Sequence, residues 1–457
     1  MRSPGTNDNR LRICVVGGGP AGMAAAWAAA KCGAEVTLIE RSPYLGGVLP
    51  QCIHTGFGTQ LYGEDFTGGE YEALWEKIVY ESGVSVILNA TVLKIVPAEA
   101  ADQGMDRWEV HYADPSAGAM AIKCDAVILA TGCTERTLPQ MNIPGSRPAG
   151  IFTAGAAQRM MNIKNMLPGR NAVILGSGDI GLIMARRMHL EGINVKLVLG
   201  EKESGLARNI VQCIEDFNIP LRYGWTVSET LGYQRLTGVR IREIETGREE
   251  IVECDTLLIA AGLVPDRELV PGGELVPEQK QEGLYLCGNA DHVHDLVDNV
   301  TQNAVRTAIE VCGRDDADIP PEVREIADKQ LPAQSKDKSG NMVCTVCPKG
   351  CIMKVTKNPF AVTRNECTRG EDFARQEVEN PQRIVTTVLR TESGGIVSAR
   401  TEQPVPKEEI PAVMEAARTI VAPDHAKSGS VISHGTYRFV ITGANNMHIS
   451  STPRCQR

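Results

Sequence analysis

The pattern Gly-x-Gly-x-x-Gly occurs twice in the chain, each time between an apolar run that suits a buried strand and a stretch of helix formers. In the first copy, residues 11–16 are apolar, residues 17–22 carry the glycines, and residues 23–31 are rich in alanine. A second strand over residues 35–39 ends at Glu40. This order of strand, glycine turn, helix, strand and acid predicts a dinucleotide-binding unit.

Each residue of the first turn has a physical task. Gly17 makes the tight turn, Gly19 admits a pyrophosphate, and Gly22 lets the helix pack on the strand. The helix N-terminus supplies N–H donors for the phosphates, and Glu40 can accept hydrogen bonds from ribose hydroxyls. The predicted contacts of the first nucleotide are Gly17, Gly19, Pro20, Ala21, Gly22 and Glu40.

The second copy follows the same order, with a strand at residues 171–175, glycines within 176–181, a helical stretch at 182–191 and a strand over 194–199. Counting from the glycines, the acidic position falls on Leu199. We therefore expect a nicotinamide cofactor without a choice between NAD and NADP, and a degenerate repeat that has lost its ligand is the alternative. The predicted contacts are Gly176, Gly178, Asp179 and Gly181.

Composition narrows the class of protein. The 457 residues are 42% hydrophobic and carry a net charge of −9, which argues against a general nucleic-acid surface. No run of about 20 apolar residues could span a bilayer, and the first ten residues lack the apolar stretch of a signal peptide. We expect a cytoplasmic protein, in which the 14 cysteines are thiols or metal ligands rather than disulfides.

Three further segments make a family resemblance specific. Residues 127–132 form an apolar strand ending in Ala-Thr-Gly, residues 257–262 echo it, and residues 283–289 end in Gly-Asn before a helix. With the glycine turns, this order resembles the two-dinucleotide-binding flavoprotein superfamily that includes the pyridine nucleotide–disulfide oxidoreductases. The resemblance implies FAD in the first unit, with Thr131, Gly132, Gly288 and Asn289 among its contacts. Asn289 replaces the Asp that is usual there.

The resemblance also implies an α/β fold with two Rossmann-like domains, the second inserted into the first. The expected FAD-binding domain comprises residues 8–150 and 265–326, and the NAD(P)-binding domain comprises residues 151–264. Within the superfamily, residues 51–58 and 178–187 look like a narrower group that is similar to the flavoprotein subunits of hydrogen cyanide synthase, opine oxidase and sarcosine oxidase. That group is often found beside glycerol-3-phosphate dehydrogenases.

Two side chains are candidates for catalysis. Cys52 stands where the family presents residues to the flavin, but no second cysteine lies near it, so a dithiol relay is not favoured. The alternative role for Cys52 is that of a small buried hydrophobe. His294 could relay a proton, since its pKa lies near neutrality, and its alternative is a place in a capping loop.

A polar linker at residues 327–342 precedes a cysteine-rich α+β module at 343–430 and a tail at 431–457. Cys344, Cys347, Cys351 and Cys367 follow the spacing C-x2-C-x3-C-x15-C. Three local thiols and one distant thiol favour a [4Fe–4S] cluster, with zinc or metal-free thiols as alternatives. The module is similar to a small uncharacterised bacterial domain. A surface helix expected within 406–421 has the inward pattern Ile410, Val413, Met414, Ala417 and Val421.

The leading hypothesis is an FAD-dependent oxidoreductase that moves electrons between NAD(P)H, FAD and an iron–sulfur cluster or a partner subunit, such as a glycerol-3-phosphate or amine dehydrogenase. A second hypothesis is a dehydrogenase or oxidase subunit that acts on a small amino or imino acid. A third is a non-catalytic flavoprotein subunit with a zinc-stabilised docking domain.

Overall fold

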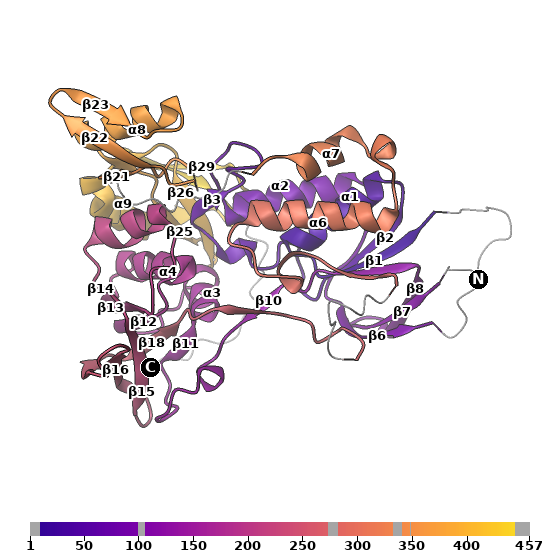
Figure 1. The fold of residues 1–457 in the computed structure, drawn as a ribbon, viewed down its shortest axis with the longest axis horizontal. Coiled ribbons are helices and arrows are strands. Elements are labelled where there is room, and N and C mark those ends of the chain that lie inside the picture. Colours follow the sequence, from indigo (N-terminus) through magenta and orange to yellow (C-terminus); the bar gives the residue numbers. More distant parts are fainter. Residues whose placement is uncertain (1–9, 99–105, 273–281, 332–340, 348, 444–457) are drawn as a thin grey trace.

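The computed structural model describes residues 10–98, 106–272, 282–331, 341–347 and 349–443. Its first unit is built on a five-stranded parallel sheet in the order β20-β9-β1-β2-β5. The strands are β1 (Arg12–Val16), β2 (Glu35–Ile39), β5 (Ser85–Ile87), β9 (Ala126–Leu129) and β20 (Leu284–Leu286). Because β20 follows the whole second unit in the chain, the first unit is made of two separate segments (Figure 1).

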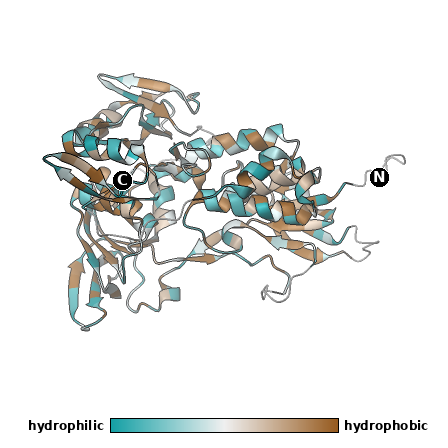
Figure 2. Cartoon of the chain, turned by 45° about the horizontal axis from the view of Figure 1, so that its top comes forward, coloured by the Kyte–Doolittle hydropathy of each residue, from teal (hydrophilic) through white to brown (hydrophobic). Residues whose placement is uncertain are grey.

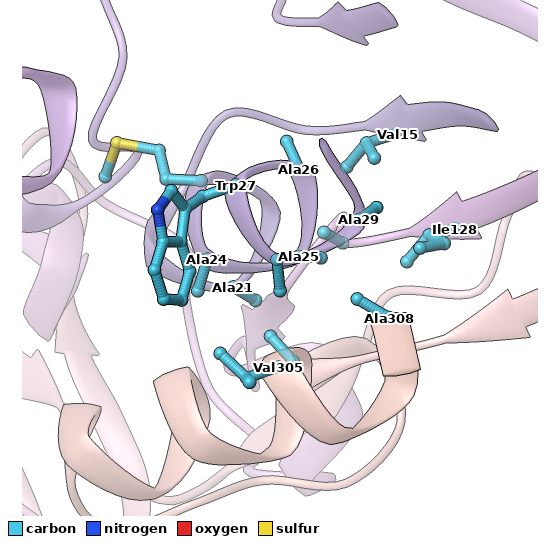
Figure 3. Packing of buried hydrophobic residues seen from close by; sticks show 14 of the residues in the cluster. Val15, Ala21, Ala24, Ala25, Ala26, Trp27, Ala29, Ile128, Val305 and Ala308 are labelled. Carbon is cyan, nitrogen blue, oxygen red and sulfur yellow. The ribbon is translucent and has the colours of Figure 1, made fainter. Parts of the chain in front are cut away.

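Helices α1 (Pro20–Lys31), α2 (Gly68–Glu81) and α6 (Val297–Cys312) lie together on the first sheet (Figure 1). The alanines of α1 leave no bulky side chain on much of its surface, so α6 can approach closely. Figure 3 shows Val305 and Ala308 of α6 facing this alanine-rich helix, with Val15 and Ile128 on the sheet side. The sequence thus places a tightly packed helix directly behind the first glycine turn.

The second unit repeats the architecture between β9 and β20. Its five parallel strands run in the order β11-β18-β12-β13-β14. They are β11 (Ile151–Thr153), β12 (Asn171–Leu175), β13 (Asn194–Gly200), β14 (Leu221–Tyr223) and β18 (Thr256–Ile259), with helices α3 (Ala154–Ile163), α4 (Asp179–Leu190) and α5 (Ala207–Asn209). This α/β arrangement of two parallel sheets is the predicted fold class.

Antiparallel pieces complete both units. Each sheet is accompanied by a three-stranded antiparallel layer, and β3 pairs with β4 in the first unit. A two-stranded ribbon of β10 and β19 carries the chain from one unit to the other and back. The strands are β3 (Thr55–Phe57), β4 (Phe66–Thr67), β6 (Thr91–Pro97), β7 (Trp108–Asp114), β8 (Gly118–Cys124), β10 (Cys133–Glu135), β15 (Trp225–Gly232), β16 (Leu236–Glu243), β17 (Glu249–Glu253) and β19 (Leu263–Pro265). Helix α7 (Pro321–Asp328) ends the first unit.

The C-terminal module is α+β, as predicted, and lies at the upper left of Figure 1 beside α4. A five-stranded sheet runs in the order β28-β25-β26-β30-β29, and a small three-stranded sheet runs β21-β22-β23. The elements are β21 (Met342–Val343), β22 (Ile352–Lys357), β23 (Phe360–Thr363), α8 (Thr368–Glu379), β24 (Gln382–Arg383), β25 (Thr386–Thr391), β26 (Ile396–Thr401), β27 (Val405–Pro406), α9 (Ile410–Thr419), β28 (Val421–Ala422), β29 (Val431–His434) and β30 (Tyr437–Ile441).

One sequence expectation for this module is wrong. The sequence places residues 431–441 in a tail, but β29 and β30 pair with each other and β30 adds to β26. Phe439 and Ile441 are fully buried, so this hairpin supplies part of the module's core. The linker expected at 327–342 falls largely on residues 332–340, which lie outside the described residues, as do residues 444–457 of the tail.

The module contacts both other units through ion pairs. Arg383 pairs with Asp216 of the second unit at 2.7 Å and with Glu377 at 2.8 Å. Arg400 pairs with Glu70 of the first unit at 3.0 Å. In Figure 2 the strands of the sheets are largely brown, whereas the covering helices carry much teal, as expected for sheets enclosed by amphipathic helices. Among the described residues, no helix is long and apolar enough to cross a membrane.

Candidate functional site

The first glycine turn is shaped by close backbone contacts. Gly17 has a φ of +102° and donates its N–H to the Ile39 carbonyl at 2.8 Å. A Cβ on Gly17 would lie 2.6 Å from the Ala130 oxygen, and one on Gly22 would overlap the Gly17 carbonyl. Gly19 differs, since the nearest atom to its Cβ position is 4.0 Å away. Two glycines are therefore needed for packing, whereas Gly19 keeps a space open in front of the turn.

Helix α1 begins directly behind this open space. Gly19 is its N-cap, Pro20 and Ala21 form its first turn, and no described side chain caps it. Its first N–H groups are therefore available to an external acceptor, and the helix dipole favours a negative charge there. This combination is the arrangement by which helices hold phosphates.

Glu40 follows β2 and is 6% exposed. Its carboxylate accepts hydrogen bonds from the N–H groups of Gly18 at 2.6 Å and Ser42 at 2.7 Å. These bonds fix the carboxylate beside the glycine turn and leave acceptor capacity on both oxygens. The acid is thus held in the position that the sequence predicted for it.

The segments that end at Gly132 and Asn289 flank the same glycine turn. Ala130 contacts Gly17, and the Thr131 hydroxyl donates to the Asp266 carbonyl at 2.7 Å, while Gly132 has a φ of +80°. Gly288, with a φ of +59°, packs so closely on Ala21 that an added Cβ would lie 2.5 Å from the alanine Cβ. Both segments therefore approach the start of α1.

Asn289 is held at both ends of its carboxamide, one by its own loop and one by β10. Its oxygen accepts from the His294 N–H at 3.0 Å, and its nitrogen lies 3.6 Å from the Cys133 sulfur. All the residues predicted to contact the first nucleotide therefore lie on the segments that surround one helix N-terminus.

The second turn repeats the backbone geometry of the first. Gly176 has a φ of +123° and donates to the Leu199 carbonyl at 2.8 Å. A Cβ on Gly181 would overlap the Gly176 carbonyl, whereas the Cβ position of Gly178 has only the Ser204 hydroxyl at 3.9 Å. Gly178 is the N-cap of α4, as Gly19 is of α1. This turn also keeps one open glycine.

Its polar residues differ from those of the first turn. Asp179 opens α4, and its carboxylate accepts from the Leu206 N–H at 2.7 Å and the Asn209 amide at 2.8 Å. Burial raises the pKa of Asp179, and these two hydrogen bonds oppose the rise. A partly buried carboxyl group therefore stands at the helix end where the first turn has a proline.

The position of the missing acid needs a correction. Counting residues gives Leu199, but Leu199 accepts the Gly176 N–H as Ile39 accepts that of Gly17, so the counterpart of Glu40 is Gly200. The error arises because the pairing of β12 with β13 shifts between Ala172 and Val173, which adds one residue to β13.

Ser177 fills the space that an acid would need. A Cβ on Gly200 would overlap the Ser177 hydroxyl, which donates to the Lys202 carbonyl at 2.9 Å. The second turn thus has a serine and a glycine where the first has Gly18 and Glu40. The sequence could have revealed this pair only after the register shift in β13 was known.

Cys52 and His294 do not form one constellation. Cys52 follows a 3-10 turn at Leu49–Gln51, and its sulfur lies 3.8 Å from the Gln158 oxygen on α3. Burial raises the pKa of Cys52 to about 12, so the thiol stays protonated near neutral pH. Among the described residues no hydrogen bond or ring contact joins it to His294.

The imidazole of His294 packs on that of His292, with ring centroids 4.0 Å apart. Its Nε2 atom is buried without a hydrogen-bond partner among the described residues. Burial lowers the pKa of His294, and His292 adds to the effect. The ring is therefore neutral near pH 7 and keeps one nitrogen free for an outside group.

The four cysteines of the C-terminal module come from two neighbouring places. Cys344 donates its N–H to the Cys351 carbonyl at 2.8 Å, Cys347 lies in the turn between them, and Cys367 is the N-cap of α8. Burial raises the pKa of Cys344 to about 11, and the other three thiols contribute to the rise. Within the part of the chain that is described, no three ligand-type side chains stand at metal-binding spacing. Pro348, within this turn, lies outside the described residues.

Comparison with known proteins agrees with this geometry. Residues 11–288 match the family described as pyridine nucleotide-disulphide oxidoreductase, and residues 368–442 match a family described as a protein of unknown function (DUF1667). The first match covers more than half of the chain, so the chain belongs to the pyridine nucleotide-disulphide oxidoreductase family. That family is one of FAD-dependent oxidoreductases, and the resemblance seen in the sequence is confirmed.

Among curated proteins, the chain is similar to the hydrogen cyanide synthase protein HcnB of Pseudomonas protegens, with 29% identity over 62% of this chain and 65% of that one. It is also similar to an opine oxidase subunit from Rhizobium meliloti, with 26% identity over 62% of this chain and 59% of that one. The chain therefore spans less than two thirds of the length of these relatives.

Among solved structures, the thioredoxin reductase of T. acidophilum has a TM-score of 0.54 at 20% identity, over 67% of this chain and 99% of that one. The thioredoxin reductase of Lactococcus lactis also has a TM-score of 0.54, at 18% identity, over 66% of this chain and 98% of that one. At these identities the likeness shows that the two-unit fold is shared.

Proposed function

We propose that this oxidoreductase moves electrons between NAD(P)H and FAD, and onward to an iron–sulfur cluster in its own C-terminal module or to a partner subunit. The observation that carries the proposal is the presence of two glycine turns, each with an open N-cap glycine at a helix N-terminus, in one chain. Transfer between a nicotinamide and a flavin needs one pyrophosphate site for each cofactor. FAD, when bound, supplies both two-electron and one-electron chemistry.

The first turn is proposed as the FAD site. The N–H groups of the first turn of α1, which begin at Ala21 because Pro20 has none, would hold the pyrophosphate, and Glu40 would accept from a ribose. The segments ending at Thr131–Gly132 and Gly288–Asn289 would line the rest of the cofactor, since they enclose the same helix end. His294, with its free buried nitrogen, is proposed to hold or pass a proton there.

The second turn is proposed as the nicotinamide-nucleotide site, with Gly176, Gly178 and Gly181 shaping its cradle. Gly200 offers no carboxylate to a ribose, so the acid that favours NAD over NADP in many such domains is missing. We propose the domain limits given above, 8–150 with 265–326 for FAD and 151–264 for NAD(P). The two parallel sheets draw their strands from within those ranges.

The four cysteines suit a cluster in their chemistry and in their arrangement along the chain. Cys344 and Cys351 adjoin the paired strands β21 and β22, and Cys347 lies in the turn between them. Cys367 stands at the N-terminus of α8, which favours a thiolate. Cys344, Cys347, Cys351 and Cys367 would hold a [4Fe–4S] cluster, with zinc as the alternative. A redox-active metal is favoured because the module is fused to a flavoprotein and zinc cannot change oxidation state.

A second candidate function is oxidation of a small amino or imino acid by one component of a larger enzyme. The curated relatives favour it, because several are named as components of multi-subunit enzymes, among them those of opine oxidase and sarcosine oxidase. Under this proposal a separate dehydrogenase subunit would be the partner, and Cys52 would line the substrate side of the flavin as a neutral thiol.

Anaerobic purification followed by iron, sulfide, zinc and flavin analysis tests the proposal as a whole. We expect FAD and about four iron atoms per chain. Cysteine-to-serine changes at the four positions should remove iron, leave FAD in place and spare flavin reduction by the nicotinamide. Zinc without iron or sulfide would contradict the electron-transfer role of the module. Reduction of the flavin by an amino acid and by neither NADH nor NADPH would favour the second candidate.

A further inference from the structure

A small cavity lies where all three parts of the chain meet. Residues 53–55 of the first unit line one side, α3, α4 and the segment 208–213 of the second unit line the others, and Thr386 on β25 of the C-terminal module closes it. Its volume is about 30 Å³, enough for roughly two or three atoms of the size of a water oxygen. The cavity is therefore too small for a nucleotide, but it can receive the charged end of a small molecule.

The wall of this cavity is positively charged. It includes Arg186, Arg187 and Arg208, and no aspartate or glutamate lines it. Arg187 is neutralised locally, because it pairs with Glu191 and donates to the Asn162 oxygen at 2.8 Å. The other two arginines have no such acid, since no ion pair joins either to a carboxylate among the described residues.

Both arginines also keep unused donors. Arg208 is only 5% exposed, and its Nη1 atom is buried without a hydrogen-bond partner among the described residues. Arg186 has a buried Nε atom without a partner in the same part of the chain, and its Nη2 donates to the Ile384 carbonyl of the C-terminal module at 3.2 Å. Buried guanidinium donors normally have hydrogen-bond partners, so two unpaired donors on one cavity wall are what an anion-binding site presents.

The nearby acids are occupied elsewhere. Asp216 is held by Arg383 and Lys407, each at 2.7 Å, and Asp179 accepts from Leu206 and Asn209. Asp65 lies near Arg208 without forming an ion pair with it, and its carboxylate also interacts with Thr55 and Gly56. Among the described residues, none of these carboxylates is in direct contact with the guanidinium group of Arg186 or Arg208.

We propose that this cavity binds the oxyanion end of a small ligand, a carboxylate or a phosphoryl group, between Arg186 and Arg208. The planar guanidinium fork matches the oxygens of both groups. His54 lies on the same wall, and burial, with a smaller contribution from the two arginines, lowers its pKa to about 4, so the ring is neutral. Its Nδ1–H donates to the Thr55 carbonyl at 3.1 Å, which leaves the two arginines as the donors to the bound group.

The site is separate from the second nucleotide turn. Arg186 lies seven residues beyond Asp179 on α4, which corresponds to about 10 Å along the helix axis. The site also borders the C-terminal module, through the bond from Arg186 to the Ile384 carbonyl and through Thr386. A bound anion would therefore connect the first unit, the second unit and the module without occupying either nucleotide site.

Thermal unfolding of the whole FAD-loaded protein tests the site. Potassium phosphate and potassium acetate are each titrated against potassium chloride at constant ionic strength. We expect at least one of them to raise the midpoint temperature in a saturable way, because a ligand that binds the folded state stabilises it. A response to phosphate alone identifies a phosphoryl site, and a response to acetate alone identifies a carboxylate site.

Arg208→Gln should abolish this response and leave the midpoint in chloride unchanged or higher, because the variant removes an unpaired buried charge. Arg390→Gln, which removes an exposed arginine of β25 outside the cavity, should respond as the parent does. If Arg208→Gln does not fold, Arg186→Gln takes its place. The absence of a saturable response to either anion in the parent, or an unchanged response in the variant, would overturn the proposal.

Discussion

The two glycine turns share one backbone and differ in the residues around it. Both close with an N–H to carbonyl bond of 2.8 Å to the neighbouring strand, and both have a glycine whose Cβ would overlap the turn itself. The first turn then has Gly18 and Glu40, whereas the second has Ser177 and Gly200. Packing thus explains the shared glycines, while the residues after the second strand determine what each turn can recognise.

The N-termini of the helices behind the two turns also differ in their polar residues. Helix α1 opens with an uncharged Pro20, and α4 opens with Asp179, whose carboxyl group is held by Leu206 and Asn209. A negative charge stabilises a helix N-terminus but repels a phosphate placed there. The first turn is therefore suited to permanent, tight binding, and the second to weaker, reversible binding of a nucleotide that comes and goes.

The largest expected effect comes from filling the first cradle. Gly19→Val should reduce the FAD content of the purified protein more than about tenfold, which corresponds to a loss of at least about 1.4 kcal/mol. Gly19 has an extended backbone with a φ of −71° and no atom closer than 4.0 Å to its Cβ position, so valine blocks the ligand without disturbing the fold. Flavin absorbance per chain is the measurement.

Gly22→Ala is the contrasting variant in the same turn. Its Cβ would overlap the Gly17 carbonyl, so we expect a loss of folding stability of about 1–3 kcal/mol in addition to any loss of FAD. Chemical denaturation distinguishes the two variants. A Gly19→Val protein that retains full FAD would show that the first turn is not the flavin site.

The matched change in the second turn is Gly178→Val. Its backbone is also extended, with a φ of −73°, and the nearest atom to its Cβ position is 3.9 Å away. We expect this variant to keep its FAD and to lose most of its reduction by NADH or NADPH, at least about tenfold in apparent affinity. If the variant is reduced as fast as the parent, the second turn is a degenerate repeat.

A smaller effect, on the choice between NADH and NADPH, should follow when the second turn is given the counterparts of Gly18 and Glu40. The double variant Ser177→Gly with Gly200→Glu removes the hydroxyl that occupies the space and supplies the missing carboxylate. We expect a several-fold shift of preference towards NADH, because the acid accepts ribose hydroxyls and repels a 2′-phosphate. Gly200→Glu alone should be less stable, since its Cβ overlaps Ser177. An unchanged NADH to NADPH ratio would argue against the equivalence of Gly200 and Glu40.

The smallest expected effect concerns Asp179. Asp179→Asn should strengthen nicotinamide-nucleotide binding about two- to fivefold, because it removes a negative charge worth about 0.3–1 kcal/mol at the helix end. Since burial raises the pKa of Asp179, lowering the pH should strengthen binding in the parent as the carboxyl gains a proton, and this trend should be weaker in the variant. Dissociation constants measured at several pH values check both points, and identical pH profiles would contradict them.

The first unit could be predicted from the sequence because each of its signals is local. The glycines of the first turn, the alanine-rich helix behind them and Glu40 follow one another within about 30 residues of chain, roughly the length of a βαβ unit. The inward face of α9 is predictable for the same reason, with Ile410, Val413, Met414 and Ala417 buried, although Val421 beyond the helix end is exposed. The roles of Cys52 and His294 stay predictions.

Other features depend on contacts between distant segments, which the sequence alone does not display. The counterpart of Glu40 escapes a residue count because the extra residue in β13 is visible only in its pairing with β12. The hairpin β29–β30 resembles a tail in the sequence because its place beside β26 is a property of the folded module. Arg186 and Arg208 face one cavity because α4, α5 with the turns that follow it, and β25 converge there, and only the Arg186–Arg187 pair within α4 could have hinted at it.

An anaerobic absorbance titration of the parent, Gly178→Val and Gly19→Val proteins with NADH and NADPH tests the central claim most directly. The account predicts that at least one nucleotide bleaches the flavin of the parent, that Gly178→Val contains the flavin but is not bleached at the same concentrations, and that Gly19→Val contains little flavin. Dithionite should bleach both flavin-containing proteins equally. A parent protein whose flavin is reduced by dithionite but by neither nucleotide would contradict the claim that the two turns hold cofactors that exchange electrons.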